Sequence, residues 1–218
     1  MKDSEGIKYY SPLEEKINII SHAIGFVLSF IGLVFLIRHA TLYGNVWHIV
    51  SFSIFGTSLL ILFAASTLYH NSKEPVLRKR MRIVDHAAIY ILIAGTYTPY
   101  TLVTLHGTIG WVIFSVSWGI ALIGITLKFF FTGKYNVVST LMYVLMGWII
   151  VFAIKPLINN LPVEGVVWLA MGGLAYTMGA IVYSIKTIKF NHAIFHLFVL
   201  FAAFCHFISV FFYVLPCE

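Results

Sequence analysis

The sequence predicts an all-α integral membrane protein, a seven-transmembrane helix bundle. Three observations support this fold class. Of the 218 residues, 60% are hydrophobic and only 10% are charged, whereas a soluble domain carries about 25% charged residues. The mean hydropathy is +0.93. The apolar residues also fall into seven runs of about 20 residues, the length that crosses a bilayer as a helix.

The seven runs follow one another with short breaks. The first begins near Ile17 after a polar start, and no small-residue cleavage pattern closes it, so we expect a retained helix and not a cleaved signal peptide. Glycine, proline, asparagine or charged residues mark each later break. The expected helices span residues 17–37, 46–69, 84–105, 110–128, 137–155, 164–185 and 192–214. No linker separates them, so we expect residues 1–218 to form a single membrane domain.

The basic residues predict how the bundle is oriented. Only Arg38 and Lys155 fall at one end of the expected helices. The other twelve of the 14 lysines and arginines fall at the opposite end: Lys2, Lys8, Lys16, Lys73, Arg78, Lys79, Arg80, Arg82, Lys128, Lys134, Lys186 and Lys189. The positive-inside rule then places the N-terminus in the cytoplasm and the C-terminus outside. Basic loops of a multi-pass protein in a cell membrane explain the net charge of +6, so we expect no nucleic-acid partner.

Several residues bear on packing. Small residues recur along one face of the sixth run: Gly172, Ala175 and Gly179. They predict a close approach by a neighbouring helix, although a chance excess of glycine is the alternative. Tyr97 and Pro99 are expected to pack and to kink the third helix. Cys205 lies inside the last run, so a disulfide to Cys217 at the chain end is not expected.

The main functional signal is a set of polar residues expected at one depth. The second run ends with Ser66 and His70, which share a helix face, and the third begins with Asp85 in its first turn. The seventh begins with His192 and His196, an i,i+4 pair whose imidazoles lie about 6 Å apart on one face. Ionisable groups inside a membrane are costly and usually face the bundle interior. We therefore expect three helices to bring these residues together.

Three imidazoles and a water molecule form a catalytic zinc site. Neutral imidazole also binds copper, iron and nickel, so the residue types alone do not choose the metal. Zinc lowers the pKa of bound water from 15.7 to about 7, which makes hydroxide available near neutral pH. In this interpretation Asp85 accepts or orients the proton of that water, and Ser66 bonds Asp85 or a developing oxyanion.

Each polar residue also has a structural alternative. A membrane histidine can simply bond a neighbouring helix, and that is the interpretation we favour for the deeper His206. His22 is either a supporting residue of the metal site or structural, and Asp85 could form an i,i+3 surface pair with Arg82. Three more histidines at run ends are expected to be interfacial: His39, His48 and His106.

At these residues the chain resembles bacterial hemolysin III-type proteins of the progestin and adipoQ receptor superfamily. This superfamily includes the adiponectin receptors and is distantly similar to alkaline ceramidases. The resemblance covers nearly the whole chain and rests on residues 14–18 with His22, 66–70, 85–86 with 91–99, and 191–196 with 206–207. It implies a seven-helix fold with the N-terminus inside and zinc near the cytoplasmic face. The metal ligands of the family would be His70, His192 and His196, its acidic residue Asp85, and its serine Ser66.

Three functions remain open from the sequence. The first is a zinc-dependent intramembrane hydrolase of a lipid amide or ester, with a membrane lipid as its partner. The second is a pore-forming cytolysin, which needs polar residues along a whole path or a ring of subunits. The third is a lipid-responsive receptor or sensor with a structural zinc, for which Asp85 offers a fourth ligand. The sequence indicates neither the substrate nor the oligomeric state.

Overall fold

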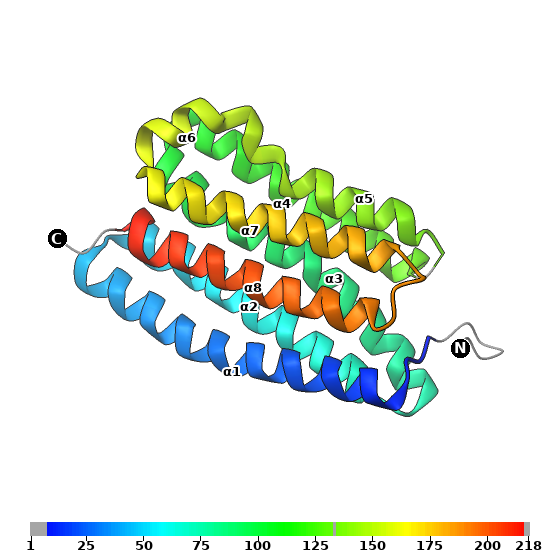
Figure 1. The fold of residues 1–218 in the computed structure, drawn as a ribbon. Coiled ribbons are helices and arrows are strands. Elements are labelled where there is room, and N and C mark those ends of the chain that lie inside the picture. The colour runs from blue at the N-terminus through cyan, green and yellow to red at the C-terminus, as the bar shows by residue number, and fades with distance from the viewer. Residues whose placement is uncertain (1–7, 133, 216–218) are drawn as a thin grey trace.

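The computed structural model describes residues 8–132 and 134–215. Within these residues, seven helices are long and apolar enough to cross a membrane (Figure 1), which confirms the predicted all-α class. The spans are Pro12–Tyr43, Val46–Asn71, Pro75–Leu105, Gly107–Phe131, Val137–Asn160, Val163–Ser184 and Asn191–Val214. The chain is a multi-pass membrane protein. Cys217 lies outside the described residues.

Polar residues cap the N-terminal ends of the first two helices. Helix α1 (Pro12–Tyr43) begins after Ser11, whose hydroxyl accepts a hydrogen bond from the Glu14 amide. Helix α2 (Val46–Asn71) begins with a capping box in which Asn45 and His48 each accept a backbone hydrogen bond from the other. Such caps satisfy amides that lack an intrahelical partner.

Helix α3 (Pro75–Pro99) begins at Pro75 and not at residue 84 as the sequence predicted. The Glu74 carboxylate accepts hydrogen bonds from the amides of Val76 and Leu77, so the basic stretch that follows is helical. As a result Asp85 lies almost three turns into the helix, and not in its first turn. The predicted irregularity at Pro99 is present, because the span continues from there as the π-helical segment η1 (Tyr100–Leu105).

The fifth span is interrupted. It consists of α5 (Asn136–Gly147), the 3-10 segment η2 (Ile149–Ala153) and α6 (Ile154–Asn160). The Tyr97 hydroxyl lies 3.0 Å from the Met146 carbonyl oxygen and 2.7 Å from that of Gly147, and it accepts a hydrogen bond from the Ile150 amide. A tyrosine expected only to pack therefore satisfies the backbone groups that the interruption frees.

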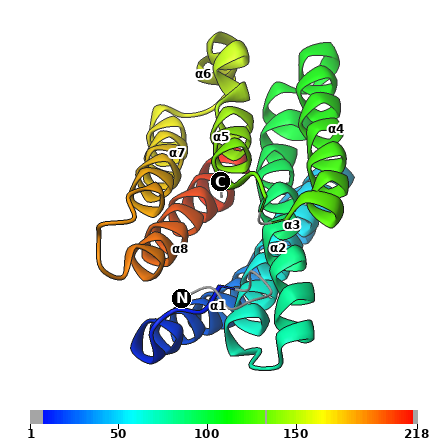
Figure 2. The same cartoon turned by 90° about the vertical axis from the view of Figure 1, so that its right-hand side faces the viewer.

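The remaining helices are α4 (Gly107–Phe131), α7 (Val163–Ser184) and α8 (Asn191–Ser209), which continues as the π-helical segment η3 (Val210–Val214). Helix α8 packs against α7 and α1, and α2 joins α1 to α3. Figure 2 shows α3 with α4 on one side of the bundle, α7 with α8 on the other, and α1 with α2 across its base. The face of α7 that meets α8 carries the small residues predicted as a ridge, since Gly172 and Gly179 are buried against α8.

Candidate metal centre

Three histidines from two helices meet at one end of the bundle, as the sequence predicted. His70 lies at the end of α2, and His192 and His196 lie on the first turns of α8. The Nε2 atom of His192 is 3.0 Å from Nε2 of His70 and 3.1 Å from Nε2 of His196. All three side chains are buried, and their ligand atoms lie within 4.8 Å of one another.

This geometry fits a metal ion. Nitrogens that bind one zinc ion tetrahedrally at about 2.0–2.1 Å lie roughly 3.3–3.4 Å from each other. The two short Nε2 distances, 3.0 and 3.1 Å, require only a small expansion to reach that value. The donors are three imidazoles, which suit zinc as well as copper, iron and nickel. The cluster could therefore hold a metal ion whose identity the donors alone do not fix.

Glu15 sets the orientation of the His70 ring. Its carboxylate oxygen Oε2 lies 2.7 Å from His70 Nδ1. Because a carboxylate only accepts hydrogen bonds, the proton of His70 is placed on Nδ1 and the lone pair of Nε2 faces the other histidines. A hydrogen bond of this kind fixes the tautomer of a metal-binding histidine and makes it a better ligand.

Arg78 holds Glu15 in turn. The guanidinium of Arg78 is 2% exposed and forms an ion pair with Glu15 Oε1. It also donates hydrogen bonds to the carbonyl oxygens of Lys8, 3.1 Å away, and Ser72, 3.1 Å away. A buried charge needs a counter-ion and full hydrogen bonding. Arg78 therefore connects the N-terminal segment, the end of α2 and the start of α3 around the histidines.

The N-terminal segment covers the centre. The Tyr10 ring stacks on His192 with centroids 4.5 Å apart and an interplanar angle of 13°. The Tyr10 amide donates to Glu15, and Lys8 Nζ lies 4.2 Å from the centroid of the Tyr10 ring. Burial, together with the positive charge of Lys186, lowers the pKa of Lys8 to about 8. Burial also raises the pKa of Tyr10 well above its usual range, so its hydroxyl stays protonated.

Asp85 and Ser66 lie next to the histidines on α3 and α2. Both are buried, and the Ser66 hydroxyl donates a hydrogen bond to the Asp85 carboxylate. The burial of Asp85 argues against the alternative of an exposed surface pair with Arg82. Both residues line a cavity onto which His192 and His196 also open.

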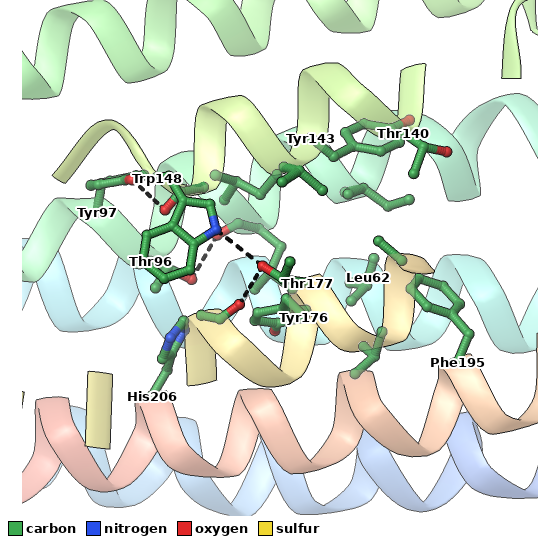
Figure 3. Close-up of a pocket in the computed structure, with 18 of the residues that line it drawn as sticks. Leu62, Thr96, Tyr97, Thr140, Tyr143, Trp148, Tyr176, Thr177, Phe195 and His206 are labelled. Atoms are coloured by element: carbon green, nitrogen blue, oxygen red, sulfur yellow. Dashed lines mark hydrogen bonds between the residues drawn. The ribbon is translucent and has the colours of Figure 1, made fainter. Parts of the chain in front are cut away.

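This cavity has a volume of about 220 Å³ and extends from the histidines along the bundle interior. Apolar residues of α2, α3, η2, α7 and α8 form most of its wall. Figure 3 shows the indole of Trp148 in this wall, with its N–H donating to Thr177 at 3.0 Å. A cavity with mostly apolar walls and a polar end at the histidines is suited to an apolar chain with a polar head.

The other histidines have separate roles. His22 stacks on His196 with centroids 3.6 Å apart, so it supports the cluster by packing. His206 lies within 3.2 Å of the Leu169 carbonyl oxygen and bonds a neighbouring helix, as predicted. His39, expected to be interfacial, is buried and bonds the Leu215 carbonyl at 2.7 Å. His48 caps α2, and the exposed His106 bonds the Val103 carbonyl at 3.2 Å.

Sequence reasoning assigned no role at the site to Glu15, Arg78 or Tyr10. Glu15 had a usable signal, since it is a carboxylate at the edge of an apolar run. Arg78 was counted among the basic residues that orient a membrane protein, and nothing in its position separates it from Lys79 or Arg80. Tyr10 lies before the first helix, where a pattern of helix faces does not apply.

The comparisons with known proteins cover nearly the whole chain. The model of the family described as "Haemolysin-III related" matches residues 10–207. Hemolysin-3 of Bacillus cereus is 46% identical over 203 residues, which are 93% of each chain. The Hemolysin-3 homolog of Bacillus subtilis (strain 168) is 46% identical over 200 residues, covering 92% of this chain and 94% of the relative. The human monocyte to macrophage differentiation factor is 30% identical over 207 residues, covering 90% and 83%.

Proposed function

The chain belongs to the haemolysin-III related family, and from the geometry of its histidine cluster we propose that it is a zinc-dependent intramembrane hydrolase of a lipid amide or ester. The observation that carries the proposal is that His192 and His196, Asp85 and Ser66 all face one cavity with apolar walls. Ionisable groups in the interior of a membrane protein are costly and mark functional sites.

The proposed mechanism gives each residue a separate role. His70, His192 and His196 would hold the ion, and Glu15 keeps His70 in the tautomer that binds it. Zinc, when bound, supplies a nucleophile near neutral pH because it lowers the pKa of water to about 7.

The Asp85 carboxylate accepts a proton in the reaction and returns it to the leaving group. Its hydrogen bond from Ser66 holds it in place. Ser66 lies at the same cavity end. Once Asp85 holds the proton, the single Ser66 hydroxyl proton is free to turn to the carbonyl oxygen of the substrate, where negative charge develops. The apolar wall takes the acyl chain, which places the scissile carbonyl at the histidines.

The charge distribution supports an orientation with the N-terminus in the cytoplasm and the C-terminus outside. The basic residues that follow α2, begin α3, end α4 and connect α7 to α8 lie at the same end as the histidines. By the positive-inside rule this end faces the cytoplasm. The centre would then lie near the cytoplasmic face, where Tyr10 and Lys8 cover it.

The proposal is tested by metal content and by activity on the same preparations. Detergent-purified wild type is compared with His192→Ala and His196→Ala by elemental mass spectrometry, with His106→Ala as the matched control because His106 is exposed and remote from the site. We expect one zinc ion per chain in wild type and control, and its loss from both site variants.

Hydrolysis is then measured on a panel of fatty-acyl amides and esters. We expect activity in wild type and His106→Ala only, and a loss of activity without a loss of zinc in Asp85→Asn. A His196→Ala protein that retained full hydrolysis of every substrate cleaved by wild type would show the mechanism to be wrong.

A pore-forming function is the second candidate, because two of the relatives are named Hemolysin-3 and Hemolysin-3 homolog. It differs from the hydrolase in a measurable way, since a pore conducts ions without a metal or a substrate.

A further inference from the structure

The cavity has a second polar end that the proposed mechanism does not use. We propose that Tyr176 and His206 form a subsite for a hydroxyl group carried by the lipid chain, far from the carbonyl that lies at the histidine cluster. The inference rests on the proposed function because it takes the occupant to be the lipid substrate of that site, and it adds a feature of the substrate.

His206 lies in the wall of the cavity and has an unused hydrogen-bond acceptor. Its Nε2 atom lies 3.2 Å from the Leu169 carbonyl oxygen, which only accepts, so the proton of the ring is on Nε2. Nδ1 is then an acceptor, and it is buried with no hydrogen-bond partner among the described residues. The ring is closely packed on Gly172, where a β-carbon would overlap it. This packing limits the movement of the His206 ring towards α7.

Tyr176 lies beside His206 and has an unused hydroxyl. Its ring centroid is 5.5 Å from that of His206, and its oxygen is buried without a partner among the residues of the described chain. Both residues line the cavity, and Figure 3 shows them below Trp148 in the view. Leaving a buried polar group unsatisfied costs about 1–3 kcal/mol, so an occupant that bonds both groups is favoured.

The chemistry of these groups selects a hydroxyl. His206 Nδ1 requires a donor, which excludes an ether or a carbonyl oxygen, and the Tyr176 hydroxyl can both donate and accept. The charged residues in the described lining are Asp85 and Lys128, and both lie near His86 towards the histidine cluster. The far end thus favours a neutral group that can donate and accept at once.

The position of the subsite sets a length for the chain. His206 follows His196 by ten residues on the continuous helix α8, which corresponds to roughly 15 Å of helix rise. The cavity wall between them is apolar, with Leu62, Leu92 and Val199 among its residues. A hydroxylated chain of matching length reaches both ends, whereas a shorter one leaves its hydroxyl against an apolar wall.

The test is binding of chain-length series to zinc-loaded, detergent-purified protein by isothermal titration calorimetry. The probes are saturated carboxylic acids of increasing length, each measured beside its ω-hydroxy counterpart. We expect the ω-hydroxy acid to bind about fivefold tighter at one chain length, which corresponds to about one hydrogen bond. Shorter ω-hydroxy acids should bind less tightly than their unsubstituted counterparts.

Two variants and one control test whether Tyr176 and His206 cause the preference for the hydroxyl group. Tyr176→Phe and His206→Phe should abolish the hydroxyl preference and leave the affinity for unsubstituted acids unchanged. Tyr90→Phe makes the same chemical change at a residue outside the cavity lining, where the hydroxyl contacts Met142 Sδ at 3.8 Å, and it should retain the preference. Equal affinity of the two acids at every length in wild type, no binding of either, or a preference that survives in both variants would each overturn the subsite.

Hydrolysis and metal content are measured on the same samples so that the two proposals fail separately. If the protein prefers the ω-hydroxy acid but cleaves no lipid, the subsite is supported and the hydrolase function is contradicted. If the protein hydrolyses lipids but shows no hydroxyl preference, the hydrolase function is supported and the subsite is contradicted. Tyr176 and His206 would then bond water.

Discussion

Glu15 is the residue on which most contacts around the histidines converge. It accepts from His70 Nδ1 at 2.7 Å, from the Tyr10 amide at 3.1 Å and from the guanidinium of Arg78. A carboxylate that orients a metal-binding histidine contributes 10–100-fold to metal affinity or activity. The position of the His70 ring, and hence the shape of the centre, depends on a residue that lies outside the proposed set of ligands.

Glu15→Gln should therefore weaken zinc binding about 10- to 100-fold, and the loss of the counter-ion of Arg78 should lower stability without unfolding the chain. The amide neither carries the charge that favours a polarised imidazole nor pairs with Arg78. Zinc affinity is measured by competition with a chromogenic chelator, and folding by circular dichroism. Glu14→Gln is the matched control, because Glu14 is the neighbouring carboxylate and makes no contact with His70. Equal loss in both variants would show a general effect of charge at the start of α1.

Lys8 should titrate near pH 8, far below an ordinary lysine, because burial and the charge of Lys186 disfavour its ammonium form. Between about pH 8 and the ordinary lysine value the unfolded chain holds a proton that the folded chain has released, so stability rises with pH across this window. Rates of acetylation of Lys8 against pH, read by mass spectrometry, give the value. Lys186→Gln should raise the pKa of Lys8. An unchanged pKa would show that the charge of Lys186 does not contribute to the shift.

At the residue scale the sequence predicted the histidine cluster better than the residues that support it. His70, His192 and His196 could be found because helical spacing and membrane depth are both readable from the chain. Asp85 was placed at the right end of the bundle although its helix begins earlier than expected. The contacts of Arg78 and Tyr10 could not be found, because they depend on how the N-terminal segment folds back over α2 and α3, which no periodicity records.

At the scale of elements, the contact between α7 and α8 positions both ends of the cavity. Helix α8 carries His192 and His196 at its start and His206 further along. The buried glycines of α7 let it approach this helix closely, with Gly172 beneath His206 and Gly179 against Phe198. The sequence predicted this ridge. It did not predict the interrupted fifth span, since an apolar run does not show where its helix changes geometry.

Gly172→Ala should destabilise the protein by about 1–3 kcal/mol, because the added methyl overlaps a ring that cannot move away and lies against the Ala202 carbonyl. Gly119→Ala is the control, since a β-carbon there meets no atom within 4 Å. It should be neutral or stabilising by up to about 1 kcal/mol, from the helix propensity of alanine. Denaturant unfolding in detergent compares the two, and similar stabilities would mean that the ridge does not limit the packing.

At the scale of the molecule, the basic residues and the cavity are arranged along the length of the bundle. Basic residues gather at the end that holds the histidines, and the cavity runs from there into the apolar interior. The proposed orientation predicts that green fluorescent protein is fluorescent when fused to the N-terminus, and that alkaline phosphatase is active when fused to the C-terminus. The reciprocal fusions should be inactive. Activity of phosphatase at the N-terminus would reverse the orientation.

The hydrogen bonding of hydroxyl groups along the bundle bears on whether the protein conducts ions. A pore needs polar groups along a whole path, but hydroxyls at several depths are already bonded within their own helices. Thr67 donates to the Phe63 carbonyl, Thr96 to Leu92 and Thr126 to Leu122, at 2.7 or 2.8 Å. Because these groups are satisfied locally, they do not supply a polar lining.

We therefore expect no ion current from wild-type protein in planar bilayers at any protein concentration, with or without zinc. The zinc-loaded protein from the same preparation should cleave its lipid substrate. His196→Ala separates the two functions, because a metal-dependent hydrolase loses its activity in this variant while a pore keeps its current. Discrete current steps that grow with protein concentration and persist in His196→Ala would make this chain a pore former, and the buried histidines would then be contacts between helices.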